Sequence, residues 1–489
     1  MPFLNLSPRR GDRTLALQAL ALAALGTLSA CANLPEPGKH PAPLDATQLG
    51  LPAAAPTAAG AEIDAQWWRA FGDAQLNQWI EQATANHPSL RVAQARLERV
   101  RAQSAVLEAA DGPQANANLD LTRQLFTSTG MYPPPLAGTV RETGTLQASG
   151  SWELDFFGKN RAAIEAALGQ VHAAEADAQA AQMLLASNVA RSYFQLLRIT
   201  AQREVAQRSL AQREQMLALV RSRVDAGLDT PLELRQSEGT LPEARLQLEQ
   251  LQEQEQLTRN GLAALVAQPK QRLASTLPAL AALQPISVPR SMPLDLLARR
   301  ADIAAARQRV LAAQSDVENA RAQFYPNINL VAFAGLSSIG FDRLFDAGSQ
   351  QWGVGPALRL PLFDGGRLRA QLRGRNADLD GAIASYNALV IDAVREAADQ
   401  LASLQSIARQ QAEQAQTQAK AEATHAIAAQ RFQAGLATAM QVLAAESAVL
   451  AQRRLGVDLT ARALDCQVQL IRALGGGYRD PSPDLAHAP

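Results

Sequence analysis

The segment RVDAGLDTPLELRQSE, residues 223–238, occurs a second time in this chain as RFQAGLATAMQVLAAES, residues 431–447. Each copy follows a long run of helix-favouring residues and contains an Ala-Gly-Leu triplet. Glycine readily adopts the positive φ with which many helices end, and it lets another chain approach closely. Each copy therefore predicts a long helix that reverses at a tight turn, at about 224–231 and again at about 433–439.

Two further pairs of segments match in the same order and with the same spacing. HPSLRVAQARLERVRAQ from His87 corresponds to RADIAAARQRVLAAQ from Arg300, and SWELDFFGKNRA from Ser151 corresponds to LRLPLFDGGRLRA from Leu358. Chance similarity among alanine-rich helices does not reproduce this order. The chain is therefore predicted to be an internal duplication, with one structural unit written twice.

Alternating segments predict a β-hairpin in each repeat. Between 115 and 122, alanine and leucine alternate with asparagine, aspartate and threonine, which is typical of a half-buried strand, and 143–154 returns with a weaker alternation. In the second repeat, one strand is predicted to begin after Pro326, and residues 352–360 are predicted to form the second strand of the hairpin. Pro356 interrupts that last strand, so we expect a bend or a sheet edge there.

Long helical stretches follow each hairpin, at 161–224 and 368–432, and neither contains a proline. At 1.5 Å per residue, such a helix is roughly 95 Å long, far more than a globular core needs. Apolar residues recur in heptads, which predicts coiled-coil packing. The heptad positions of the second helix are Leu372, Leu379, Tyr386 and Ala393, with Ile383, Val390, Ala397 and Leu404. In the returning helix of the first repeat, Glu255 interrupts the series Leu241, Leu248 and Leu262.

Composition and motifs exclude several function classes. The 489 residues contain 46 Lys+Arg and 46 Asp+Glu, so no net positive field is available to hold nucleic acid. Neither a phosphate-binding loop nor a dinucleotide-binding glycine motif opens a helix, and the five histidines are scattered singly. We expect no enzymatic activity, no cofactor and no metal site. Cys466, in an apolar helix, is expected to be a small buried side chain.

The first thirty residues have the features of an export signal. Three arginines within the first thirteen residues precede an uncharged run at 14–30, which is short for a permanent membrane helix. The run ends in Leu28-Ser29-Ala30-Cys31, which resembles the bacterial lipobox and implies a multiply acylated N-terminal Cys31. Residue 32 is alanine and not the aspartate associated with inner-membrane retention, so we expect anchoring in outer-membrane lipid. Residues 31–61, rich in proline and alanine, are interpreted as an extended tether.

Four strands in one chain cannot close a membrane barrel. Strands of ten to twelve residues can cross a bilayer, but open sheet edges are not tolerated in lipid, and the smallest usual barrel has eight strands. If the strands span a membrane, several copies of the chain must therefore share them. The expected organisation is a signal peptide (1–30), a tether (31–61), a first repeat (62–285; hairpin about 113–155), a second repeat (286–475; hairpin about 326–361) and a tail (476–489).

Several motifs resemble those of the TolC-like outer-membrane factors, in particular the lipoprotein branch that serves multidrug efflux pumps of the resistance-nodulation-division (RND) type. The resemblance covers nearly the whole mature chain. It is carried by Trp67-Trp68 with Phe71-Gly72-Asp73 and Leu76, by Asn86-His87-Pro88, by Trp152-Glu153-Leu154-Asp155 with Phe157-Gly158, and by Gly355-Pro356 followed by 360–367, LPLFDGGR.

This resemblance implies an α+β membrane protein. Long antiparallel helices would form a periplasmic α-barrel, and four transmembrane strands per protomer would contribute to a shared twelve-stranded β-barrel in a homotrimer. It further implies a cell outer-membrane location, extension into the periplasm, and two partners: a periplasmic adaptor (membrane fusion) protein and an inner-membrane RND-type pump. The chain would be the exit duct through which drugs or other small compounds leave the periplasm passively.

The resemblance also assigns roles to the two turns. The family docks its adaptor at the helix tips, which here are Gly227, Leu228 and Thr230 in the first copy and Gly435, Leu436 and Thr438 in the second. For any one glycine an ordinary helix cap is the commoner explanation, but two copies in matched contexts favour docking. Family members often have an acidic residue after the second tip glycine, whereas this chain has alanines at 437 and 439. Candidates for a periplasmic gate are therefore Arg221, Arg223, Asp225, Asp229 and Arg431, although charges at solvated helix ends often contribute nothing specific.

Two alternatives remain open at this point. The same architecture serves as the exit duct of a type I protein-secretion system. A periplasmic structural lipoprotein without a pore would also use long helices, although the alternating hairpins argue against it. The substrate range, the cognate pump and the resting state of the gate are not encoded in any pattern of this sequence.

Overall fold

The computed structural model describes residues 40–44, 63–269, 273, 277–286 and 299–478. The predicted signal segment, Cys31 and most of the predicted tether lie outside these residues. The described elements are η2 (Trp67–Phe71), α2 (Ala74–Asn86), α3 (Pro88–Asp111), β1 (Gln114–Leu125), β2 (Val140–Leu154), α4 (Lys159–Asp225), α5 (Pro231–Val266), η4 (Leu280–Ala282), α7 (Ala301–Ala322), β3 (Asn327–Ile339), η5 (Phe341–Arg343), η6 (Ala347–Ser349), β4 (Gln350–Arg359), α8 (Arg367–Gln433) and α9 (Ala439–Ala473).

The chain forms two compact units. The first contains residues 40–42, 98–172 and 308–384, and it includes all four strands. The second contains residues 173–307 and 385–478 together with the described residues of 43–97, which include most of the long helices. The prediction of a mostly helical chain with a small sheet is confirmed.

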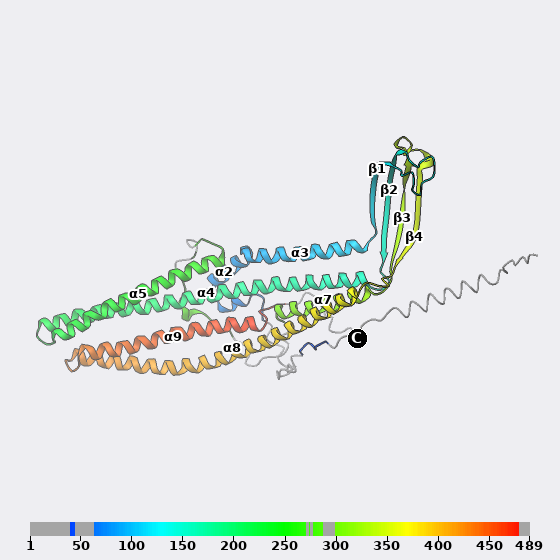
Figure 1. The fold of residues 1–489 in the computed structure, drawn as a ribbon. Helices are drawn as coiled ribbons and strands as arrows, with labels where there is room; N and C mark the ends of the chain where they lie inside the picture. The colour runs from blue at the N-terminus through cyan, green and yellow to red at the C-terminus, as the bar shows by residue number, and fades with distance from the viewer. Residues whose placement is uncertain (1–39, 45–62, 270–272, 274–276, 287–298, 479–489) are drawn as a thin grey trace, which may run out of the picture. The chain divides into compact units, whose positions relative to one another are not determined.

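The first unit is built on one antiparallel sheet with strand order β1-β2-β3-β4 (Figure 1). β1 pairs with β2 from Gln114 opposite Ser151 to Leu125 opposite Val140. β4 is an edge strand, and its Pro356 lies opposite Leu330 of β3. The expectation of a bend or a sheet edge at Pro356 is confirmed for the single chain, in which β4 pairs only with β3.

The prediction that one face of β1 is buried is wrong for the single chain. Every residue of β1 is exposed. The sheet makes no close approach to a second layer among the described residues, and leucines such as Leu119 and Leu121 remain more than half exposed. A sheet that leaves its apolar side chains uncovered in the monomer needs lipid or another chain to cover them.

In the second unit, α4 and α5 form one helical hairpin and α8 and α9 form another (Figure 1). α4 and α8 both have 67 residues, and α5 and α9 have 36 and 35. The equal lengths agree with the duplication seen in the sequence. The heptad residues Ile383, Val390, Ala393 and Ala397 of α8 are almost fully buried, as the coiled-coil pattern predicted.

Glu255, which interrupts the leucine heptad of α5, is buried with its charge compensated. It forms ion pairs with Arg203 of α4 and, at 3.0 Å, with Arg259 one helical turn away. Only 4 % of Glu255 is exposed. The interruption is therefore a charged contact between the two helices of the hairpin.

The main core of this unit is aromatic. Phe71 contacts Phe194 edge to face at a centroid distance of 4.9 Å, and Trp79 contacts Tyr193 in the same way at 5.3 Å. Tyr193 also donates a hydrogen bond to Asp73, which caps α2. Burial, followed by this hydrogen bond, raises the pKa of the Tyr193 phenol, so it remains protonated. Trp67, Trp68 and Trp79 are packing residues, as expected from the sequence.

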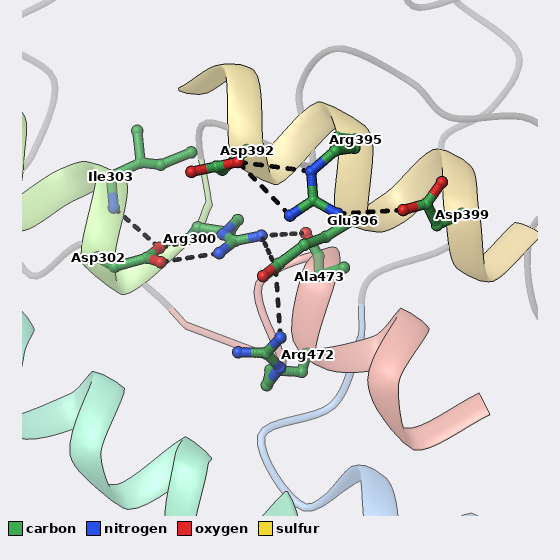
Figure 2. Close-up of polar contacts among 9 residues, drawn as sticks. All are labelled: Arg300, Asp302, Ile303, Asp392, Arg395, Glu396, Asp399, Arg472 and Ala473. Atoms are coloured by element: carbon green, nitrogen blue, oxygen red, sulfur yellow. Dashed lines mark hydrogen bonds and ion pairs between the residues drawn. The ribbon is translucent and has the colours of Figure 1, made fainter. Parts of the chain in front are cut away.

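A charged network joins the start of α7 to α8 and to the end of α9 (Figure 2). Arg300 contacts Asp302 at 2.8 Å and Glu396 of α8 at 3.1 Å, and Glu396 also pairs with Arg472 of α9 at 3.3 Å. Burial acts to lower the pKa of Arg300, but its hydrogen bonds and charge pairing with Asp302 and Glu396 outweigh burial and raise it. The network therefore carries fixed charges that hold the three helices in register.

Candidate functional site

The first candidate site is the turn between α4 and α5. Gly227 has φ 71°, and its amide donates to the carbonyl of Val224 at 2.9 Å. The amide of Leu228 donates to the carbonyl of Arg223 at 2.8 Å. These two bonds form a Schellman motif, which satisfies the last carbonyls of α4 and requires a residue that tolerates positive φ.

The turn between α8 and α9 has the same geometry. Gly435 has φ 74°, its amide donates to Phe432 at 3.0 Å, and the amide of Leu436 donates to Arg431 at 2.8 Å. Thr230 and Thr438 occupy equivalent N-cap positions, and each belongs to a capping box with the residue three positions later. The sequence match between the two turns is thus a match of backbone conformation.

The two turns pack against one another through an apolar cluster. Val220 of α4, Phe432 of α8 and Val442 of α9 are buried together there, and Leu234 of α5 is partly buried against them. Above this cluster the turns are open. Leu228 and Leu436 are 68 % and 69 % exposed, and a Cβ added to either glycine would meet no atom within 4 Å. Each turn therefore presents an exposed leucine beside an uncovered glycine backbone.

The charged residues predicted for the gate are only partly brought together. Arg223 contacts Asp229 through two nitrogens at 2.9 and 3.2 Å, and its guanidinium carbon lies 4.8 Å from the ring centroid of Phe432. The hydrogen bond that Arg223 donates to Asp229 raises the pKa of Arg223 further. Arg221 pairs instead with Glu238 of α5 at 3.2 Å. Asp225 and Arg431 make no ion pair with any residue that the structure describes.

Phe432 was not singled out from the sequence. It is 1 % exposed, and it connects the second hairpin to Arg223 of the first. One difference between the two repeats could have pointed to it. The position after the equivalent arginines is Val224 in the first repeat and the aromatic Phe432 in the second. The contact crosses between hairpins, however, and no local pattern predicts such a pairing.

The second candidate site is the sheet, whose two faces differ in chemistry. Residues directly opposite one another in an antiparallel ladder share a face. One row runs through Ala117, Ala148, Ala334 and Trp352, and the next row along the strands is Leu119, Leu146, Leu336 and Gln350. The opposite face carries Asn116, Ser149, Phe333 and Gly353 in one row and Asn118, Gln147, Gly335 and Gln351 in another. One face is therefore predominantly apolar and the other predominantly polar.

Other kinds of site are absent from the part of the chain that the structure describes. No helix there combines the length and the apolar character needed to cross a membrane. No three histidine, cysteine, aspartate or glutamate side chains converge there to hold a metal ion. Cys466 is buried and free, as expected.

Comparison with known proteins identifies the family to which this fold belongs. The model of the outer membrane efflux protein family matches residues 79–268 and 292–476. The multidrug resistance outer membrane protein MdtQ of Escherichia coli O157:H7 is 34 % identical over 431 residues, which are 85 % of this chain and 88 % of that protein. The fusaric acid resistance protein FusA of Burkholderia cepacia is 39 % identical over 373 residues, which are 74 % of this chain and 69 % of that protein.

A solved structure agrees with these sequence matches. The outer membrane protein VceC of Vibrio cholerae superposes with a TM-score of 0.80 at 36 % identity, covering 85 % of this chain and 100 % of VceC. The fold is that of the TolC-like outer-membrane channels, which combine a helical barrel with a β-barrel. The chain belongs to the outer membrane efflux protein family.

Proposed function

We propose that this protein is a homotrimeric exit duct of a tripartite efflux pump, through which drugs or other small compounds pass passively from the periplasm to the outside. The observation that carries the proposal is the sheet. Among the described residues it has two unpaired edges, β1 and β4, and it has one apolar and one polar face. Alternation of lipid-facing and lumen-facing residues is the hallmark of strands in an outer-membrane barrel.

Three copies satisfy the requirements of such a sheet. β1 and β4 are each an open edge, so pairing β4 of one copy with β1 of the next removes every edge. Four strands from each of three copies give the twelve-stranded barrel that the family resemblance implied. The apolar face would then contact lipid, and the polar face would line the lumen.

The helix tips are proposed as the docking sites for the periplasmic adaptor. At each tip, an exposed leucine gives a partner an apolar side chain to contact, and the neighbouring glycine leaves the backbone accessible. Each chain has two such tips, at equivalent positions of the two repeats. Such a surface suits another helical tip of similar size. Arg223, Asp229 and Phe432 hold the two tips of one chain together, so we assign them to the closed state of the periplasmic gate.

We also propose that Cys31 is lipidated and anchors the protein in the outer membrane. This rests on the lipobox-like sequence before Cys31, since the anchor lies outside the described residues. The described part of the predicted tether is held against the body of the chain. Nδ1 of His40 lies 2.8 Å from Oδ1 of Asp380, and the amide of Leu44 donates to Asn387 at 2.7 Å.

The proposal is tested by recording single-channel currents from the purified trimer in a planar bilayer. We expect stable conductance steps, and we expect Gly435→Trp at the second tip to alter them because that position opens directly onto the predicted periplasmic entrance. Gly348→Trp, in the loop between β3 and β4, controls for the added bulk, and Gly365→Trp, in the turn after β4, controls for a tryptophan at positive φ, since a Cβ at either position also meets no atom within 4 Å. If the protein gives no steps under conditions that insert a known outer-membrane channel, even after Asp225 and Asp229 are neutralised, a spacer without a pore replaces the duct.

Complementation separates the two kinds of duct. In a strain that lacks its own outer-membrane channel, the chain is expressed either with an RND-type pump and its adaptor or with an ATP-driven protein exporter. Restored drug tolerance with the first set supports the efflux duct. Restored export of the polypeptide with the second set alone would instead support a duct for protein secretion.

A further inference from the structure

A cavity of about 600 Å³ lies within the first unit at the base of the sheet, where strands meet helices. Its polar lining includes Lys159 of α4, Asn319 of α7, Asn327 and Asn329 of β3, Arg359 of β4 and Arg367 of α8. The turns after β2 and after β4 enclose it, and Phe157 stacks on Tyr325 along one wall at a centroid distance of 4.9 Å. The cavity is thus formed by segments from both repeats.

The register of the sheet fixes the face on which this cavity opens. Asn327 lies opposite Arg359, and Glu153 lies opposite Asn329. These positions alternate with Ile328 and Leu358 of the apolar face, so they belong to the polar face. A cavity lined by them opens toward the lumen in the duct proposed above, and this inference rests on that proposed function.

Two cations around the cavity, Arg359 and Arg367, form no ion pair among the described residues. Lys159 forms an ion pair with Glu153. The carboxylate of Asp155 accepts a hydrogen bond from the backbone amide of Arg161 at 2.9 Å, and Asp364, next to the cavity, accepts from the backbone amides of Gly366 and Leu368. Arg359 has no carboxylate within ion-pair distance among the described residues. Arg367 forms no ion pair there either, but it donates to Oε1 of Gln371 at 3.5 Å and lies near enough to Asp364 to interact with it electrostatically.

Two amide side chains of the cavity wall are fixed by hydrogen bonds to the protein itself. Asn319 donates through Nδ2 to the carbonyl of Lys159 at 2.7 Å, and Gln323 donates to the side-chain oxygen of Asn319 at 3.0 Å. These bonds hold the amides in fixed orientations. Guanidinium groups suit carboxylate and phosphate oxygens because they offer planar pairs of N–H donors.

We propose that this cavity binds the carboxylate or phosphate group of anionic compounds that pass through the duct, and that Arg359 and Arg367 hold that group. Symmetry repeats both guanidinium groups around the lumen in each copy of the chain. A ring of like charges on a polar wall raises the local concentration of counter-ions and favours their passage. The duct is therefore selective for anions at the junction of barrel and helices.

Ion selectivity in a zwitterionic bilayer tests the proposal directly. Reversal potentials in a KCl gradient give the chloride-to-potassium permeability ratio, and we expect the double variant R359Q/R367Q to lower that ratio at least about twofold. The control is Arg369→Gln, two residues further along α8, which removes one positive charge at a position that does not line the cavity, and the single variants R359Q and R367Q make the comparison charge for charge. The shift should be largest near 0.1 M salt, where the Debye length is about 10 Å, and should shrink at 1 M, where it is about 3 Å.

Protection from an arginine reagent gives a second readout that does not require conduction. The detergent-solubilised full-length protein is treated with phenylglyoxal, with and without inorganic phosphate, and the modified arginines are quantified by mass spectrometry. We expect phosphate to slow modification of Arg359 and Arg367 at least about threefold, by occupying their donors, and to leave Arg369 unaffected.

The outcomes separate this proposal from the proposed function. Conductance with an unchanged permeability ratio in the double variant overturns the anion site and leaves the duct in place. An equal shift with Arg369→Gln also overturns it, because the effect is then one of general surface charge. If no conductance is seen, the duct fails, and equal phosphate protection of all three arginines would overturn the anion site as well.

Discussion

The guanidinium of Arg223 forms a two-point ion pair with the carboxylate of Asp229, at distances of 2.9 and 3.2 Å. The two side chains are 19 % and 10 % exposed, so the pair is much less solvated than the other ion pairs near the tips. Because Arg223 also stacks on Phe432, this ion pair fixes a side chain that joins the first helical hairpin to the second. In the second repeat, the residue equivalent to Asp229 is Ala437, so only one of the two tips can form this contact.

Asp229→Ala is expected to increase the open probability of the channel several-fold. The substitution leaves Arg223 without its carboxylate, and a guanidinium that is free to leave the ring of Phe432 no longer ties the two tips together. Single-channel recording measures the open probability.

The control for this experiment is Arg221→Ala. Arg221 pairs with Glu238 inside the first hairpin, and its side chain is 58 % exposed, so its loss should change the open probability little. Equal effects of the two substitutions would mean that the contact between Arg223 and Asp229 does not hold the gate closed.

Two adjacent residues of β2 should respond oppositely to the same substitution. Ala148 belongs to the apolar face and Gln147 to the polar face, and both lie near the middle of the sheet. In the barrel proposed above, Ala148→Arg would place a charge in lipid and is expected to reduce stability by about 2–4 kcal/mol, whereas Gln147→Arg would point into water and should be tolerated. The measurement is the yield of heat-modifiable trimer after refolding into vesicles. If Gln147→Arg is the damaging substitution, the faces have been assigned the wrong way round.

Sequence patterns predicted those parts of this fold that have a regular period. The heptads of α8, the alternation in the strands and the repeated Ala-Gly-Leu turns each specify a local structure that the chain adopts. Side-chain contacts between different helices were not predictable in this way. The compensation of Glu255 by Arg203 and the stacking of Arg223 on Phe432 join positions far apart in the sequence, and nothing in the spacing of charged residues distinguishes them from solvated ones.

The burial of the sheet shows a different limit of sequence reasoning. Alternation in β1 correctly separates an apolar from a polar set of residues, yet all of them are exposed in the single chain. Alternation in a strand indicates that one face of the sheet is apolar and will be buried. It does not indicate whether that face is buried by the same chain, by another copy or by lipid. The same reasoning explains why the cavity at the base of the sheet was not foreseen, since its lining comes from both repeats.

Lipidation at Cys31 predicts a clear chemical outcome. Cells that express the chain and are labelled with palmitate should incorporate the label into the wild-type protein and not into the Cys31→Ser variant. The control Cys466→Ser removes the other cysteine, which is buried in the second unit, and should leave labelling unchanged. Label that persists in Cys31→Ser would place the acylation elsewhere and remove the proposed anchor.

Glu255→Ala should destabilise the first helical hairpin substantially. Removal of this carboxylate leaves Arg203 and Arg259 without their shared partner in a poorly solvated place, which typically costs about 3 kcal/mol or more. Glu243→Ala is the matched control on the same helix, because Glu243 is 78 % exposed and pairs with Arg213 only at 3.7 Å. Urea unfolding followed by circular dichroism should give a lower midpoint for Glu255→Ala alone, and equal midpoints for both variants would show that the buried contact contributes nothing.

Glu446 of α9 gives the second unit a pH-dependent stability. Its side chain is buried and accepts a hydrogen bond from Ser209 of α4 at 3.2 Å. Burial raises the pKa of Glu446 above its ordinary 4.5, although Arg213, the hydrogen bond from Ser209 and His425 all act to lower it. The folded chain therefore binds this proton more tightly than the unfolded chain does.

An acid with a raised pKa in the folded state favours folding at low pH, and this contribution is lost as the pH rises through the raised pKa. Glu446→Gln keeps a group that can bond to Ser209 but cannot ionise. We expect the variant and the wild type to melt alike below pH 4.5, and the variant to melt higher at pH 7.5 by about 2 °C or more. Glu253→Gln, at an exposed position of α5, should track the wild type throughout. A Glu446→Gln difference that stays constant from pH 4 to 7.5 would show that ionisation of Glu446 does not oppose the packing of α9 on α4.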